Sequence, residues 1–235
     1  MTANLRRESR TFFGDQRMRV SMAGVLVWIA FSVVTQAQSA AQSPSKGYVE
    51  VVAQSALGNV TSQSFGGEAG VTVVPNIQVF VEAGMVHNIA TADISASAQQ
   101  IAGALSQVQN NVGYTVKQPV TFGVAGVKYL VPAAGTVQPY VMGGVGMAKV
   151  SQNVAFTVGG TDVTSSLSQP QYGSITLGSD LSGSFTKPMF TLGGGVTWSA
   201  WQQVVVDFQY RYGRILADDG GINVSRAGIG LGVRF

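Results

Sequence analysis

Residues 204–214, with the sequence VVVDFQYRYGR, alternate between two chemically different faces. One face carries only apolar and aromatic side chains, from Val204, Val206, Phe208, Tyr210 and Tyr212. The other carries Asp207, Gln209, Arg211 and Gly213. Because successive side chains of a β-strand point to opposite sides, this period of two predicts a strand with one apolar and one polar face. Five apolar side chains in succession on one face require an apolar surround.

The same alternation recurs along the chain from residue 47 to the end. In the last segment the apolar face holds Ala227, Ile229, Leu231, Val233 and Phe235, and the other face holds Arg226, Gly228, Gly230, Gly232 and Arg234. Segments of about ten residues with this character are typical of membrane-spanning strands. We expect eight strands, over residues 47–56, 63–74, 77–88, 116–130, 137–150, 187–198, 203–214 and 222–235. In the fourth and fifth of these, the pattern leaves open which face points outward.

The connections between these segments alternate in length. Tight turns near residues 74–76, 132–137 and 199–203 alternate with connections at 57–62, 89–115, 151–186 and 215–221. A soluble sandwich or a lipocalin-like barrel would show the same side-chain alternation, but short turns at one rim and longer loops at the other are typical of outer-membrane barrels. The sequence therefore predicts an all-β fold, a closed antiparallel up-and-down transmembrane β-barrel of about eight strands.

The first part of the chain has the composition of an export signal. Five arginines precede an uncharged run over residues 20–34, and a small-residue stretch follows in which a signal peptidase could cut near Ala37 or Ala41. We expect residues 1–41 to be a signal peptide and leader and residues 42–235 to be the barrel domain. The alternative interpretation of residues 20–34 is an uncleaved anchor helix.

The composition excludes several classes of function. The leader holds five of the fourteen Lys and Arg residues and two of the eleven acids, so removing residues 1–37 leaves nine of each. A neutral mature chain without a basic cluster gives no reason to expect nucleic-acid binding. Because the chain has no Cys, disulfides and thiolate metal sites are excluded. We expect no cofactor and no metal.

The end of the chain, residues 228–235 with the sequence GIGLGVRF, carries apolar residues that alternate back from a terminal Phe. It resembles the C-terminal signal by which outer-membrane barrels are recognised for assembly. With the export signal and the eight strands, the mature chain resembles the transmembrane domain of OmpA-like and OmpX-like small barrels of the Gram-negative cell envelope. The resemblance implies that Ile229, Leu231, Val233 and Phe235 form an assembly signal, that the barrel assembly machinery is a partner, and that the protein lies in the outer membrane.

Charged residues gather on the face that the parity places inside the barrel. This inward set consists of Glu50, Glu68, Glu82, Lys128, Asp207, Arg211 and Arg226. An eight-stranded barrel is about wide enough for its own side chains to fill, so buried charges there must pair or meet water. We expect a network of ion pairs that plugs the lumen; the alternative is a narrow channel or a conduit for small molecules. The sequence does not indicate which acid pairs with which base.

Two long connections, 89–115 and 151–186, are where we expect a surface ligand to bind. Ile94, Ile101, Leu105 and Val108 fall near one face of a helix that Asp93 could cap, so residues 93–109 are either an amphipathic helix or a loop with extended ends. Residues 151–186 are dominated by Ser, Thr, Gly and Gln, which is typical of a long surface loop.

The predicted function is therefore a structural or surface-interaction role in contact with outer-membrane lipid and lipopolysaccharide. A weaker alternative is a lipid-modifying enzyme. Barrels of this size that modify lipid A use a histidine with a serine and an acid, and here only His87 could serve. Its neighbours Met85, Val86 and Asn88 include no nucleophile, and we expect no enzymatic activity.

Overall fold

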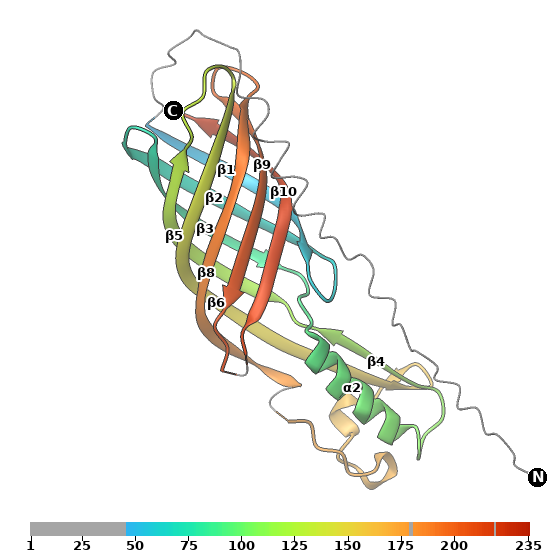
Figure 1. Cartoon of the computed structure of the whole chain (residues 1–235). Coiled ribbons are helices and arrows are strands. Elements are labelled where there is room, and N and C mark those ends of the chain that lie inside the picture. The colour runs from blue at the N-terminus through green and yellow to red at the C-terminus, as the bar shows by residue number, and fades with distance from the viewer. Residues whose placement is uncertain (1–45, 179–180, 219) are drawn as a thin grey trace, which may run out of the picture. The chain divides into compact units, whose positions relative to one another are not determined.

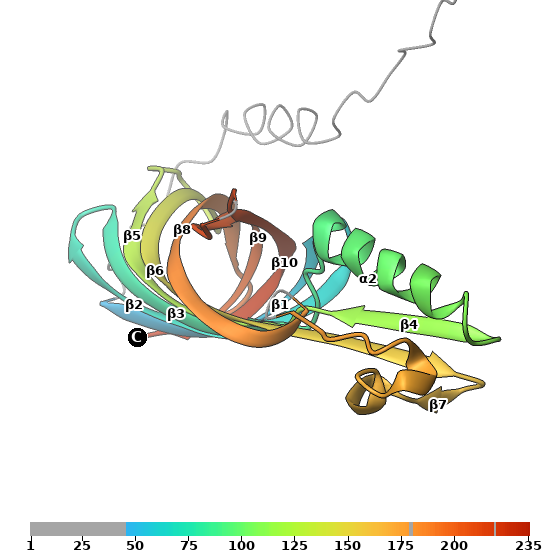
Figure 2. The same cartoon turned by 90° about the horizontal axis from the view of Figure 1, so that it is seen from below.

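Eight antiparallel strands form a closed ring in the computed structural model, which describes residues 46–178, 181–218 and 220–235 (Figures 1 and 2). The strands are β1 (Gly47–Leu57), β2 (Ser62–Val74), β3 (Ile77–Val86), β5 (Val120–Leu130), β6 (Val137–Val158), β8 (Ser182–Ser199), β9 (Val204–Ile215) and β10 (Ile222–Arg234). Each pairs with the next in this order, and β10 pairs with β1 to close the ring. The expected signal peptide lies outside the described residues.

The ring closes where the last residue meets the first strand. The backbone N–H of Phe235 donates to the carbonyl of Gly47 over 3.0 Å, and the N–H of Gly47 donates to the carbonyl of Phe235 over 2.9 Å. A Cβ on Gly47 would lie 2.9 Å from the Phe235 ring, so the ring packs directly over the glycine backbone. The terminal Phe therefore belongs to the seam of the barrel.

The alternation in the sequence corresponds to the two sides of the barrel wall. In β9 the exposed fraction of Phe208 is 49%, whereas Asp207 is 1% and Arg211 is 0% exposed. The two strands whose parity the sequence left open place apolar side chains inside: Phe122 and Val124 of β5 lie in the lumen on the same face as Lys128.

The barrel has two different rims. At one rim β2–β3, β5–β6 and β8–β9 are joined by short turns, and β1 begins and β10 ends there. We call this the short-turn rim. At the other, the long-loop rim, the connections include an additional structure built around an extension of β6 (Figure 1). Outer-membrane barrels have short turns on the periplasmic side and longer loops on the outer side.

The additional structure, which we call the arm, replaces much of what the sequence suggested to be loop. It consists of α2 (Ala92–Leu105), β4 (Val112–Lys117), the end of β6, β7 (Thr161–Asp162), and the 3₁₀ turns η1 (Thr164–Ser166) and η2 (Pro170–Tyr172). The expected loop over 151–186 is thus wrong at both ends, because β6 continues to Val158 and β8 begins at Ser182. The expected strand over 116–130 is interrupted at Gln118–Pro119, since proline cannot donate to a strand ladder.

The helix within 93–109 forms, with different ends. The Thr91 hydroxyl caps it by accepting from the N–H of Ile94, so Asp93 lies in the first turn and is not the cap. The helix ends at Leu105, which leaves Val108 outside it and 56% exposed. Among the described residues, no helix is long and apolar enough to span a membrane.

The arm has its own hydrophobic core. Ile94, Ala98 and Leu105 of α2 are buried together with Val154 and Phe156 of β6. Val163, Leu167 and Leu181 belong to the same cluster. This cluster explains why the polar composition of 151–186 misled the loop prediction: a few widely spaced apolar residues bury enough surface to extend β6 beyond the barrel.

Candidate functional site

All seven predicted inward charges lie inside the barrel, and each is at most 4% exposed. They come from β1, β2, β3, β5, β9 and β10, so the network joins strands from around the ring. Acidic and basic residues share the inward face of their strands, because both kinds point into one narrow lumen. The structure therefore brings the predicted set together.

Arg211 lies at the centre of this network. Its Nη1 lies 2.6 Å from Oε2 of Glu82, its Nη2 lies 2.6 Å from Oε2 of Glu68, and Glu50 is 3.7 Å away. These contacts join the guanidinium to the carboxylates at ion-pair distances. Arg226 holds Glu82 from the other side, with Nη1 donating to Oε1 over 2.9 Å. The Arg211 guanidinium thus compensates the charges of acids from three strands, β1, β2 and β3.

Lys128 is enclosed by two tyrosine rings. Its Nζ lies 4.6 Å from the centre of the Tyr48 ring and 4.5 Å from that of Tyr140, which are cation–π distances. The ammonium also pairs with Glu68, to which the Tyr48 hydroxyl donates, and the Tyr140 hydroxyl donates to Asp207 over 2.7 Å. These groups fill the lumen toward the short-turn rim.

Glycines on the inner wall give these side chains room. A Cβ on Gly195 would lie 2.7 Å from the Tyr140 hydroxyl, and one on Gly230 would lie 3.2 Å from Nε2 of Gln209. Both approaches are shorter than ordinary van der Waals contact, so a larger residue would displace the polar side chains. On the inner face of β10, a Cβ on Gly228 would also overlap the Ala53 carbonyl oxygen, so these glycines relieve crowding against the backbone of β1 as well as against polar side chains.

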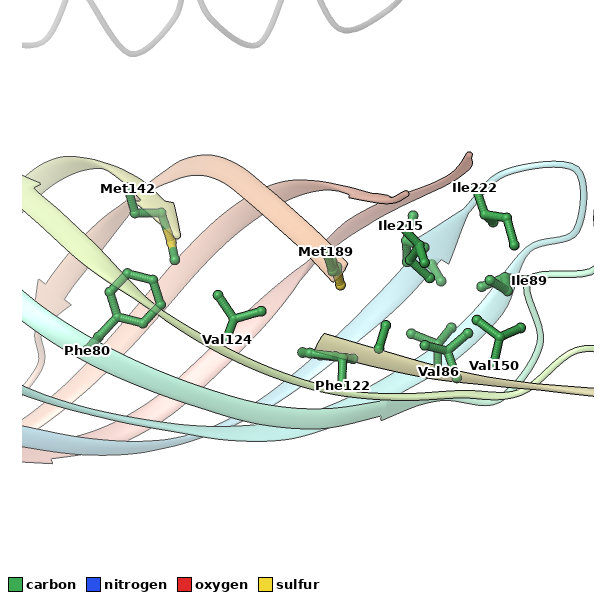
Figure 3. Packing of buried hydrophobic residues seen from close by; sticks show 14 of the residues in the cluster. Phe80, Val86, Ile89, Phe122, Val124, Met142, Val150, Met189, Ile215 and Ile222 are labelled. Carbon is green, nitrogen blue, oxygen red and sulfur yellow. The ribbon is translucent and has the colours of Figure 1, made fainter. Parts of the chain in front are cut away.

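Toward the long-loop rim, the lumen is apolar. Val86, Ile89, Val150, Ile215 and Ile222 lie together inside the barrel (Figure 3). The cluster extends inward through Phe122, whose ring lies 4.2 Å from the Arg226 guanidinium carbon. An ion crossing the barrel would have to pass both the ion pairs and this apolar layer, and hydrophobic constrictions close pores by excluding water.

The sequence did not single out four residues that complete the lumen and its entrance. Tyr48 and Tyr140 were not assigned inside, and Tyr140 is 2% exposed. Arg234 points inward near the short-turn rim, within electrostatic range of Asp207 and Glu50. The buried amide of Gln118 accepts from the N–H of Thr91, which fixes the start of α2. The parity of β1 and β10 indicates the inward position of Tyr48 and Arg234; nothing local indicates the role of Gln118.

His87 lies exposed just beyond the end of β3. In the described part of the chain, no hydrogen bond or ion pair joins its imidazole to a serine or an acid, and its backbone N–H donates to Gln63. Within the same residues, no group of three or more His, Cys, Asp or Glu side chains is placed to hold a metal ion.

One polar contact in the arm shifts a protonation equilibrium. The Thr164 hydroxyl donates to the Asp162 carboxylate over 2.6 Å, and the Thr164 backbone N–H donates over 2.9 Å. These two bonds stabilise the charged carboxylate and hold the pKa of Asp162 below its usual value. Thr164 also accepts from the N–H of Phe156, so it fastens η1 to β6.

Known proteins share this architecture. Among solved structures, the Neisserial surface protein A is 14% identical, with a TM-score of 0.50 over 81% of this chain and 98% of that one. The attachment invasion locus protein Ail of Yersinia pestis is 15% identical, with a TM-score of 0.45 over 81% of this chain and 99% of that one. The N-terminal barrel of Pseudomonas aeruginosa OprF is 14% identical, with a TM-score of 0.46 over 80% and 97%. Identities this low concern the fold alone. No curated protein matches the chain.

A sequence model of the outer membrane protein beta-barrel domain matches residues 26–235, which is most of the chain. The matched region contains all eight strands of the ring, the apolar outer face and the charged lumen. The chain therefore belongs to the outer membrane protein beta-barrel domain family, and its eight-stranded barrel lies in the cell outer membrane.

Proposed function

We propose that the protein is a surface-interaction scaffold whose closed barrel holds the arm outside the cell. The observation that carries this proposal is the division of the buried residues into two separate clusters. One cluster fills the lumen together with the ion pairs, and the other forms the core of the arm. A barrel that only conducted solutes would need neither a filled lumen nor an arm with its own core.

The outer surface of the barrel favours contact with anionic lipid. Within the described strands of the ring, every acid points into the lumen, whereas Lys149 and Arg214 point outward near the long-loop rim. Each lies between two residues buried inside the wall, such as Ala148 and Val150 around Lys149. We propose that these cations contact the phosphate groups of lipopolysaccharide, because basic side chains at membrane surfaces attract anionic headgroups.

We further propose that the outward apolar residues of β10 serve assembly. Ile229, Leu231 and Val233 are each about half exposed on the outer face, and Phe235 continues their row at the seam. A row of this kind at the closing strand would be available to the barrel assembly machinery before the seam forms.

We propose no enzymatic activity. This is supported by the environment of His87, which is exposed and has neither a serine nor an acid as a partner among the described residues.

Removing the arm is expected to abolish surface attachment and leave the barrel intact. Asn88 and Gln118 are hydrogen-bonded to each other, and the last β6–β8 pair is Asn153 with Ser182. Short Gly-Ser turns can therefore replace residues 91–117 and 154–181 without stretching the barrel. Because the two clusters are separate, the free energy of unfolding of the barrel should change by no more than about 1 kcal/mol.

The measurement compares attachment of cells that express the whole chain, the armless chain or neither to glycan-coated and uncoated surfaces. Equal amounts of protein in the outer membrane, checked by fractionation, are the control. Attachment by the armless chain equal to that of the whole chain would show that the arm is not the interaction surface.

A further inference from the structure

A cavity of about 230 Å³ opens at the long-loop rim, beside the seam of the barrel. Three segments far apart in the sequence line it: the end of β1 with its following turn, the start of α2, and the start of β10. Its volume is below the roughly 300–1,000 Å³ typical of pockets for drug-sized ligands, so it suits one small ring.

The floor of the cavity is apolar. Ala56, Ile89, Ile222 and Val224 line it, and all four belong to the cluster that closes the lumen. These side chains also pack inside the barrel, and each is at most 9% exposed. The floor is therefore a fixed apolar surface, which would cover one face of a ligand.

Polar groups surround this floor, and internal hydrogen bonds hold them in place. Asn59 donates from Nδ2 to the carbonyl of Ala90 over 3.1 Å, which leaves its Oδ1 as an acceptor. Asn223 turns its side chain to the outer face of the barrel, where its Oδ1 accepts from the Tyr212 hydroxyl over 2.8 Å, so its amide does not face the floor. Asp93 adds a carboxylate from the first turn of α2. The rim thus offers two acceptors, the Asn59 Oδ1 and the Asp93 carboxylate, to the hydroxyl groups of a ligand.

The charge of the lining narrows the class of ligand. Among the described residues that line the cavity, Asp93 is the only charged one, so an anion such as a phosphate or sulfate would meet its repulsion. The positive end of the α2 dipole partly offsets the carboxylate, which reduces the attraction for a cation. A neutral molecule that carries several hydroxyl groups fits both conditions.

We propose that this cavity binds one neutral sugar ring, with its C–H face on the apolar floor and its hydroxyls on Asp93 and Asn59. The proposal rests on the surface role proposed above, to which it adds a ligand class. It places the sugar-binding site at the long-loop rim, beside the seam between β1 and β10, where the start of α2 meets the barrel.

The test titrates the purified whole chain in detergent micelles with methyl glucoside and N-acetylglucosamine, followed by NMR. Glucose 6-phosphate and glucosamine serve as anionic and cationic probes. A ligand of this size should bind with a roughly millimolar Kd. Saturable binding of a neutral sugar that exceeds that of both charged probes supports the proposal. Absence of saturable binding by both neutral sugars, or equal or stronger binding of either charged probe, would overturn it.

Two variants locate the site. Ala92→Met lengthens a side chain that lines the cavity and should abolish binding, whereas Ala96→Met, one turn further along the exposed side of α2, should not. Asp93→Asn should weaken binding about tenfold, since a hydrogen bond to a charged group is lost. Equal binding by Ala92→Met and Ala96→Met would place the sugar elsewhere. This titration is independent of the attachment assay. The titration tests the sugar site and the attachment assay tests the surface role, so one proposal can fail while the other holds.

Discussion

Replacing Arg211 with methionine is expected to destabilise the folded barrel by about 3–5 kcal/mol, because breaking a buried ion pair leaves uncompensated charge. The guanidinium is fully buried and lies 2.6 Å from both Glu82 and Glu68. In the variant Glu82 keeps Arg226 and Glu68 keeps Lys128, but the lumen loses the positive charge that lies among all three acids of β1, β2 and β3. The loss should appear in the denaturant unfolding of protein refolded in lipid.

Arg214→Met is the matched control for this prediction. Arg214 lies on the same strand and points outward, where its Nη2 donates to the carbonyl of Gly220 over 3.0 Å. Loss of that exposed bond should cost no more than about 1 kcal/mol. Adding Glu50→Gln to Arg211→Met should recover part of the stability, since Arg211 is the only base that forms an ion pair with Glu50 among the described residues. An Arg211→Met barrel as stable as the Arg214→Met barrel would refute the proposed network.

Replacing Phe235 with aspartate is expected to lower the amount of inserted protein far more than it lowers the stability of the finished barrel. The substitution retains the two backbone bonds to Gly47 and removes only the ring, whose burial against lipid is worth about 2 kcal/mol. If the terminal aromatic is read by the assembly machinery, precursor should accumulate for periplasmic proteases. Surface-inserted protein in cells and unfolding in lipid are the two measurements.

Phe208→Arg provides the contrast. Phe208 is 49% exposed on the outer face of β9 and faces lipid between Val196 and Ile229. An arginine at the middle of the lipid-facing band should lower the free energy of unfolding by about 2–4 kcal/mol. Phe235→Asp should therefore mainly lower the amount of inserted protein, whereas Phe208→Arg should mainly lower the stability of the folded barrel. If Phe235→Asp is inserted into the outer membrane in normal amounts, Phe235 has no role in assembly.

The sequence predicts the lumen well where the strand period is strict. The position of Asp207 or Arg211 follows from parity alone, because a strand has only two faces. The pairing of Arg211 with Glu82 does not follow, since these residues are far apart in the chain and meet only when the ring closes with a particular stagger. The apolar layer of the lumen does not follow from the pattern either, because Phe122 and Val124 share a face with Lys128 and the sequence left open which face of this segment points outward.

The arm is less readable from the sequence. Its core consists of widely spaced residues such as Phe156 and Leu167 within a polar segment, so no periodic signal marks it. The capping of α2 by Thr91 lies two residues before the expected Asp93, and both residue types are good caps. Gln118, which fixes the beginning of that helix, lies 27 residues beyond Thr91, so no local pattern indicates the contact.

The most direct test of a closed barrel that acts through its outer surface is a planar-bilayer recording of the purified chain, with an open porin in the same membranes as the positive control. The ion pairs around Arg211 and the apolar layer beyond them predict no steady single-channel openings. A steady, large single-channel conductance from the pure protein would contradict the closed lumen and would favour a channel instead.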